Sequence, residues 1–220
     1  MNDIISHRNP KSIVSESVKI LRTNLQFSNV DGNMKTIMLT SSVPGEGKSF
    51  ISSNLSVAFA ALGMKVLLVD CDMRRGTQYK QFKLSNLNGL SDLLVDANVN
   101  YEKYIKDTKI ENVSLITAGT VPPNPSELLA SKKFETFISD MKEMFDIIIF
   151  DLPPVTVVPD ATIVATKVDK TVIISRVKVT PMEELEKTKK MLENVNANIA
   201  GVVVNGVKTL SKKYYGKYYD

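Results

Sequence analysis

Six short apolar runs constrain the fold of this 220-residue chain more than any other feature. Each run is apolar almost throughout, which is typical of strands covered on both faces. The runs occupy residues 36–41, 65–70, 113–118, 146–151, 170–175 and 200–205. Helix-length segments lie between them, over residues 48–62, 131–144, 160–166 and 182–196. This alternation predicts an α/β fold: an open, mostly parallel, doubly wound sheet with helices on both faces.

Composition narrows the chemistry that such a fold can carry. The hydrophobic fraction of 43% suits one globular domain, and no apolar run reaches the roughly 18 residues of a membrane-spanning helix. Cys71 and His7 are the only residues of their types, which excludes an internal disulfide, histidine triads and multi-histidine metal sites. A net charge of +4 without a basic stripe does not argue for nucleic acid. We expect a domain over residues 1–206 and a flexible, tyrosine-rich tail over residues 207–220.

The stretch SSVPGEGKSF, residues 41–50, follows the first predicted strand and opens a helix. Small residues there let backbone N–H groups turn towards phosphate oxygens, and the helix N-terminus favours negative charge. Lys48 would reach the β- and γ-phosphates, and the Ser49 hydroxyl would ligate Mg²⁺. Because Ser42 replaces the first glycine of the usual pattern, a simple tight turn is the alternative. The predicted nucleotide-binding residues are Ser42, Val43, Pro44, Gly45, Glu46, Gly47, Lys48, Ser49 and Phe50.

Three aspartates follow or end two other predicted strands. Asp70 and Asp72 lie in KVLLVDCDMR, and Asp151 lies in DIIIFDLPP. Ligands of open parallel sheets bind beyond the carboxyl ends of the strands, so these carboxylates should converge beside the phosphate loop. One such aspartate is often only a helix cap, but three beside a phosphate loop indicate a Mg²⁺·nucleotide site.

A helix is predicted over residues 12–27, before the first strand. Ser15 is the preferred N-cap, with Ser12 as the alternative. Glu16, Lys19 and Arg22 share one face of this helix, and a solvated polar face is their simplest interpretation.

The loop, the aspartates and the C-terminal SKKYYGKYYD together resemble the bacterial tyrosine kinases of capsule and exopolysaccharide systems, the BY-kinases. This family is related to the MinD and ParA ATPases. The resemblance covers nearly the whole chain and includes TAGTVPPNPSELL, residues 117–129, where we expect a proline-rich connection into a helix capped by Ser126. It implies an ATP- and Mg²⁺-dependent protein-tyrosine kinase that autophosphorylates in trans and regulates polysaccharide synthesis and export.

The resemblance also assigns roles to residues. Lys48 would stabilise the transferring phosphate, and Asp70 would accept the proton of the tyrosine hydroxyl. Ser49 and Asp72 would hold Mg²⁺, with Asp151 close by. Asn205 either contacts adenine or only ends a strand in the turn before Gly206. The implied phosphate acceptors are Tyr214, Tyr215, Tyr218 and Tyr219.

Partners follow from the same resemblance. The family carries Glu-x-x-Arg-x-x-Arg on its N-terminal helix as the contact that closes a ring of subunits. Here Lys19 replaces the first arginine, keeping the charge but losing the planar fork of donors. We expect a homo-oligomeric ring, with an octamer as one candidate size, and no nucleic acid. A membrane-embedded activator would bind through its cytoplasmic tail and place the kinase in the cytoplasm at the inner membrane face, where it has other protein tyrosine substrates.

A MinD/ParA-like switch, which hydrolyses ATP without phosphorylating protein, is the alternative function. Those switches carry a signature lysine in the phosphate loop at the position of Val43. Valine at this position favours the kinase.

Overall fold

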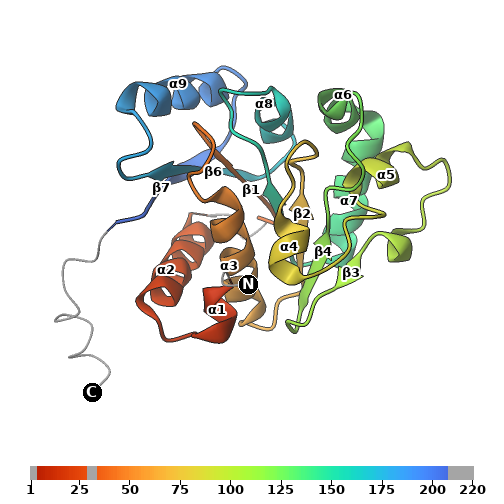
Figure 1. The fold of residues 1–220 in the computed structure, drawn as a ribbon, viewed down its shortest axis with the longest axis horizontal. Coiled ribbons are helices and arrows are strands. Elements are labelled where there is room, and N and C mark those ends of the chain that lie inside the picture. The colour runs from red at the N-terminus through yellow and green to blue at the C-terminus, as the bar shows by residue number, and fades with distance from the viewer. Residues whose placement is uncertain (1–3, 29–33, 208–220) are drawn as a thin grey trace.

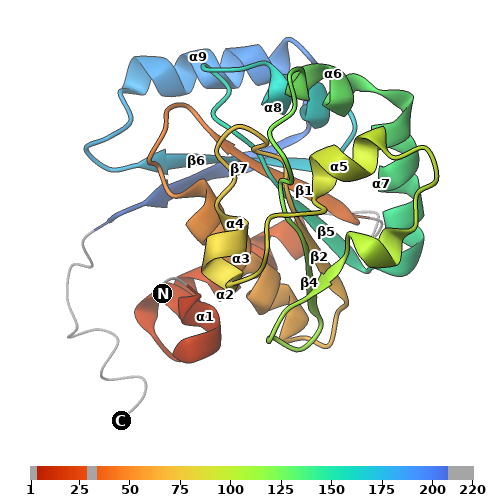
Figure 2. The same ribbon diagram turned by 45° about the vertical axis from the view of Figure 1, so that its right-hand side comes forward.

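The computed structural model describes residues 4–28 and 34–207, and a seven-stranded sheet lies at the centre of this part of the chain (Figure 1). The strand order is β3-β4-β2-β5-β1-β6-β7, and Figure 2 shows β1, β5, β2 and β4 side by side in this order. All neighbouring strands pair in parallel except β3, which is antiparallel to β4. The strands are β1 (Thr36–Ser41), β2 (Val66–Asp70), β3 (Lys106–Asp107), β4 (Val113–Ile116), β5 (Ile147–Asp151), β6 (Lys170–Arg176) and β7 (Ile199–Asn205).

Helices cover both faces of the sheet, so the predicted doubly wound fold is confirmed (Figure 1). One face carries α1 (Ile5–Arg8), α2 (Ile13–Phe27) and α3 (Lys48–Ala60). The other face carries α5 (Leu90–Val95), α6 (Pro125–Ala130), α7 (Lys132–Met144), α8 (Asp160–Ala165) and α9 (Met182–Glu193). The short α4 (Gln78–Phe82) follows β2, and a single 3₁₀ turn spans Tyr101–Lys103. Among the described residues, no helix has the length and apolar character needed to cross a membrane.

Strand β5 shows why the apolar runs are continuous. Ile147 and Ile149 pack into the hydrophobic cluster under α2 and α3, whereas Ile148 and Phe150 point to the cluster under α7 and α8. Successive side chains of a strand point to opposite faces, so burial on both faces requires apolar residues at every position. All five β5 residues are buried, as the sequence pattern predicts.

The structure corrects the prediction for the N-cap of α2. Ser12, not Ser15, caps this helix: its backbone is extended, and its Oγ accepts the N–H of Ser15 at 3.1 Å. Ser15 already lies in the first turn, where its hydroxyl donates to the Asn9 carbonyl at 2.6 Å. The buried hydroxyl is therefore used to hold the preceding turn against the helix.

The prediction that Ser126 caps a helix is also wrong. Helix α6 begins one residue earlier, at Pro125, and Asn124 is its N-cap residue. Proline suits the first helical position because the N–H it lacks would have no partner there. Ser126 lies inside the first turn, and its hydroxyl donates to Asp160 Oδ1 at 2.5 Å, which joins α6 to α8.

Candidate functional site: a phosphate loop above paired aspartates

Strands β1, β5 and β2 lie next to one another, so their carboxyl ends meet at one edge of the sheet. Asp70 at the end of β2 pairs in register with Asp151 at the end of β5. Asp151 also pairs with Leu39 of β1, two residues before the phosphate loop begins at Ser41. Pairing of parallel strands thus brings the loop and the aspartates together.

Glycine is required at two positions of the loop. Gly45 and Gly47 have φ values of 84° and 95°, in the left-handed region that other residues rarely adopt. A Cβ atom on Gly47 would also lie 2.3 Å from Asn205 Nδ2. Ser42 is buried and is not among the described residues with positive φ, so no glycine is needed at this departure from the usual pattern.

The loop is tied to the C-terminal half of the chain through Glu46. This side chain is fully buried, and its Oε2 accepts the N–H of Val43 at 2.8 Å. The Thr180 hydroxyl, from the turn after β6, donates to Glu46 Oε1. Asn205 Nδ2 donates to the Glu46 carbonyl at 2.9 Å, while Asn205 Oδ1 accepts the N–H of Gly206 at 2.8 Å. Asn205 therefore braces the loop, and its contact with adenine stays a prediction.

Asp70 is fully buried below the loop. Its Oδ2 accepts the N–H of Gln78 at 3.0 Å, and its Oδ1 accepts the N–H of Asp72 at 3.2 Å. Burial raises the pKa of Asp70 well above its ordinary value, and the negative charge of Asp151 raises it further. These hydrogen bonds oppose the shift without cancelling it.

Asp151 is also buried, and side chains bind both of its oxygens. Ser52 Oγ donates to Oδ1 at 3.2 Å, and Gln78 Nε2 donates to Oδ2 at 2.7 Å. Burial raises the pKa of Asp151, but Lys48, with Ser49 and Gln78, partly offsets this. The positive charge of Lys48 therefore acts on Asp151 as well as on the cleft.

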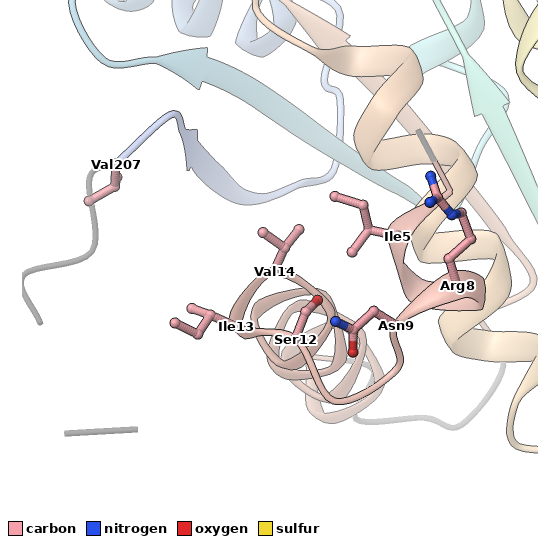
Figure 3. Close-up of a pocket in the computed structure, with 7 residues that line it drawn as sticks. All are labelled: Ile5, Arg8, Asn9, Ser12, Ile13, Val14 and Val207. Carbon is pink, nitrogen blue, oxygen red and sulfur yellow. The ribbon is translucent and has the colours of Figure 1, made fainter. Parts of the chain in front are cut away.

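A cleft of about 570 Å³ opens above these aspartates. Lys48 and Ser49 line it from the start of α3, Asp72 and Arg75 line it from the segment after β2, and Pro153 and Pro154 line it from the segment after β5. Asp70 and Asp151 lie beneath its floor rather than on its wall. A larger hollow of about 770 Å³ lies between α1, α2 and Val207, but among the described residues no carboxylate or phosphate loop lines it (Figure 3).

The carboxylates fit a Mg²⁺ ion that arrives with a nucleotide. Within residues 4–28 and 34–207, no three His, Cys, Asp or Glu side chains are placed to hold a metal ion by themselves. Mg²⁺ does not need such a set, because it usually takes one or two carboxylates together with phosphate oxygens and water. Burial and the negative charge of Asp151 raise the pKa of Asp70, and a cation at this place would oppose both effects.

The three polar residues of α2 make contacts within the chain. Lys19 Nζ lies 2.9 Å from Glu16 Oε1 and also donates to the Pro10 carbonyl at 2.9 Å. Arg22 donates to the Ala58 carbonyl at 2.9 Å, near the C-terminus of α3. Arg22 is thus more than part of a solvated face, and the oligomer contact stays a prediction. The four predicted acceptor tyrosines lie outside the described residues.

Sequence reasoning did not single out Gln78 or Thr180, nor the role of Glu46 inside the loop. Each acts through a contact with a residue more than 25 positions away, such as Ser49, Asp151 or Glu46. No local pattern marks them. The only available signal for Gln78 was a polar residue at the start of a short helix, six positions after Asp72.

The chain is similar in sequence to known protein-tyrosine kinases. A family described as an AAA domain matches residues 34–203. The tyrosine-protein kinase YwqD of Bacillus subtilis is 37% identical over 216 residues, which cover 98% of this chain and 91% of YwqD. The tyrosine-protein kinase wzc of Salmonella typhimurium is 33% identical over 219 residues, which cover 99% of this chain and 30% of wzc.

Solved structures agree with these relatives. The kinase domain of the Escherichia coli tyrosine kinase ETK superposes with a TM-score of 0.90 at 32% identity, covering 95% of this chain and 82% of that domain. The septum site-determining protein MinD of Pyrococcus horikoshii, solved with Mg-ADP, has a TM-score of 0.65 at 22% identity and shares the fold.

Proposed function

Since the chain belongs to the family of bacterial protein-tyrosine kinases, whose P-loop ATPase fold binds nucleotides, we propose that its cleft transfers the γ-phosphoryl group of ATP to tyrosine. The acceptors are the tyrosines of the C-terminal stretch of another copy: Tyr214, Tyr215, Tyr218 and Tyr219. One observation carries the proposal most strongly. The in-register pair of Asp70 and Asp151 lies directly beneath a cleft lined by Lys48, Ser49 and Asp72.

Phosphoryl transfer depends mainly on in-line positioning and on neutralising charge. The backbone N–H groups of the loop and the Lys48 ammonium bind the phosphate oxygens. Ser49 and Asp72 are the side chains that would hold Mg²⁺ directly, with Asp151 behind them. When bound, Mg²⁺ supplies positive charge to the phosphate oxygens during transfer.

Asp70 is the proposed acceptor for the proton of the tyrosine hydroxyl. A tyrosine has a pKa of about 10, so its hydroxyl needs a nearby base only as the new bond to phosphorus forms. The buried position of Asp70 raises its pKa towards that of the hydroxyl, which makes it a stronger base than an exposed aspartate. Asp72 is half-buried and lines the cleft, and we assign it as a metal ligand rather than as the base.

The family also suggests where the kinase acts. We propose a homo-oligomeric ring that uses Glu16, Lys19 and Arg22, and a membrane-embedded activator that holds it at the cytoplasmic face through a cytoplasmic tail. In this position it would regulate the synthesis and export of capsular or extracellular polysaccharide, and would phosphorylate other proteins on tyrosine.

A MinD-like switch is the competing function. The likeness to MinD at 22% identity supports a shared fold and nothing about activity. Val43 replaces the signature lysine of those switches, and the Val43 N–H is bound to Glu46 within its own loop. No feature of the described residues favours the switch.

Radiolabelled ATP distinguishes the two functions. Purified protein is incubated with Mg²⁺ and labelled ATP, with and without the cytoplasmic tail of a candidate activator. We expect label on tyrosine that is lost in Lys48→Met and in a variant with Tyr214, Tyr215, Tyr218 and Tyr219 changed to phenylalanine. ATP turnover without label on protein would support the switch and overturn the kinase.

A further inference from the structure

Gln78 is the most connected polar residue beneath the cleft, although it belongs to none of the sequence motifs. It is fully buried and begins α4. Its backbone N–H donates to Asp70 Oδ2 at 3.0 Å. Its side-chain Nε2 donates both to Asp151 Oδ2 at 2.7 Å and to the Ser49 carbonyl at 3.1 Å. One residue therefore joins the ends of β2 and β5 to the first turn of α3.

The hydrogen bonds fix the orientation of the Gln78 carboxamide. Its NH₂ group has two protons, and both are directed to acceptors, the Asp151 carboxylate and the Ser49 carbonyl. A flipped carboxamide would place Oε1 against these same acceptors, which is unfavourable. Oε1 must therefore point away from them, and it is a buried acceptor for which the described residues provide no donor within hydrogen-bonding distance.

A buried acceptor without a donor is unfavourable, and such groups are uncommon in folded proteins. A metal site offers a donor, because Mg²⁺ usually retains several water molecules when it binds to protein carboxylates and phosphates. Groups that hold the ligands of a metal contribute strongly to its affinity, and their loss typically weakens binding by about 10- to 100-fold.

We propose that Gln78 is a positioning residue of the Mg²⁺·nucleotide site. Its NH₂ group holds the Asp151 carboxylate and the Ser49 backbone at a fixed separation, and its Oε1 accepts a hydrogen bond from a water molecule of the bound Mg²⁺. This inference rests on the proposed function, because it needs Mg²⁺ to bind at Ser49 and Asp72.

The test separates metal affinity from nucleotide affinity. Gln78→Met keeps the length of the side chain and removes its donors and its acceptor. Binding of a fluorescent ADP analogue to the full chain is measured first without Mg²⁺ and then as Mg²⁺ is added. We expect the half-saturating Mg²⁺ concentration to rise by about 10-fold or more relative to the unmodified protein. The dissociation constant of the analogue without Mg²⁺ should stay within about twofold of that of the unmodified protein.

Gln81→Met is the matched control. Gln81 lies on the same short helix, and its Oε1 accepts the Ser53 hydroxyl at 2.7 Å, whereas Gln78 binds Asp70 and Asp151. We expect its Mg²⁺ titration to match that of the unmodified protein.

The outcomes are distinguishable. A Gln78→Met titration like that of the unmodified protein would overturn the role of Gln78 and leave the kinase proposal intact. If Mg²⁺ has no effect on the unmodified protein, the metal site itself is wrong and both proposals fall. If Gln78→Met does not bind the analogue even without Mg²⁺, Gln78→Asn replaces it. This shorter carboxamide cannot reach Asp151 and Ser49 together, so the same rise is expected, and its absence would overturn the inference.

Discussion

Asp70 shows how a single position can combine burial with a chemical role. It lies in register with Asp151, with no solvent exposure. Burial raises the pKa of both carboxyl groups, and the negative charge of Asp151 raises that of Asp70 further. Hydrogen bonds from Gln78 lower the pKa of both groups, and the positive charge of Lys48 lowers that of Asp151. The pair is thus adapted to a place where positive charge arrives with the substrate.

We predict that Asp70→Asn lowers tyrosine phosphorylation by about 10²- to 10⁴-fold, because the proton acceptor is lost. Since the pKa of Asp70 is raised, its ionised fraction, and with it the rate of phosphorylation, increases as pH rises through that pKa. Asp70→Asn should lose this increase. Rates measured across a pH series check the prediction, with the exposed Asp107→Asn as the control. A rate for Asp70→Asn above one tenth of the unmodified rate would exclude Asp70 as the base.

The Asp70 and Asp151 positions were predictable from sequence because both end apolar strands, and parallel pairing then places them side by side. The residues that support these aspartates and the phosphate loop were not predictable. Gln78, Glu46 and Thr180 act through contacts between distant segments, and neither propensity nor periodicity carries that information.

Among the elements, the turn after β6 supports the phosphate loop. The Thr180 hydroxyl donates to Glu46 and accepts the N–H of Arg176 at 2.8 Å. Arg176 in turn donates to the Gly45 carbonyl at 2.9 Å. These contacts join the loop between β1 and α3 to the segment between β6 and α9.

We predict that Thr180→Val raises the KM for ATP by about fivefold, with kcat within about twofold, because one hydrogen bond contributes about 1 kcal/mol. The variant keeps the β-branched shape and loses only the hydroxyl. Steady-state phosphorylation over a range of ATP concentrations checks it. Thr162→Val is the control, since that hydroxyl donates to the carbonyl of Pro159, the N-cap residue of its own helix α8. An unchanged KM would mean that this contact does not shape the phosphate loop.

A second connection between elements lies at the opposite end of β1. Asp169 Oδ2 accepts the N–H groups of Lys35 and Thr36 at 2.9 and 2.8 Å, and Lys142 Nζ lies 3.1 Å from Oδ1. Burial raises the pKa of Asp169, but the hydrogen bonds from Lys35 and Thr36 and the contact with Lys142 outweigh it and lower the pKa overall. Asp169 thus stabilises the start of the strand that leads to the phosphate loop.

We predict that Asp169→Asn lowers the free energy of unfolding at pH 7 by about 1–2 kcal/mol. A carboxyl with a lowered pKa stabilises the fold above its ordinary pKa of about 4, and this contribution is lost as pH falls through the lower folded-state pKa. The difference between Asp169→Asn and the unmodified protein should therefore shrink at acid pH. Chemical denaturation at several pH values measures it, again beside Asp107→Asn. A difference that stays constant down to pH 2 would contradict the prediction.

The elements themselves divide into those that the sequence predicts and those that it does not. The six main strands and the longer helices carry long apolar patterns, and they form within a few residues of the predicted bounds. Strand β3 and helices α1, α4 and α5 are each six residues or fewer, and the sequence does not predict them. They form because packing against the main sheet supplies the stabilisation that so short a segment lacks on its own.

At the scale of the whole molecule, the sheet holds the cleft at one edge and leaves the tail to begin after β7. From Val207 to Asp220 the side chains include four lysines and one aspartate, a sum of +3. Fourteen extended residues span at most roughly 46–50 Å, and we propose that such a positive segment is attracted to a site that contains Asp70, Asp72 and Asp151. On this proposal four phosphates, at about −1.5 to −2 each, reverse the charge of the segment and release it.

The central claim is that the cleft of one copy phosphorylates the tail of another. It is tested most directly by mixing two variants with labelled ATP and Mg²⁺. Lys48→Met keeps the tail but lacks the lysine of the phosphate loop, and the second variant keeps Lys48 but ends at Gly206. Neither should label itself. We predict label on the tyrosines of the Lys48→Met chain only when both are present. The absence of label in the mixture, while the unmodified protein labels its own tyrosines, would contradict transfer between copies.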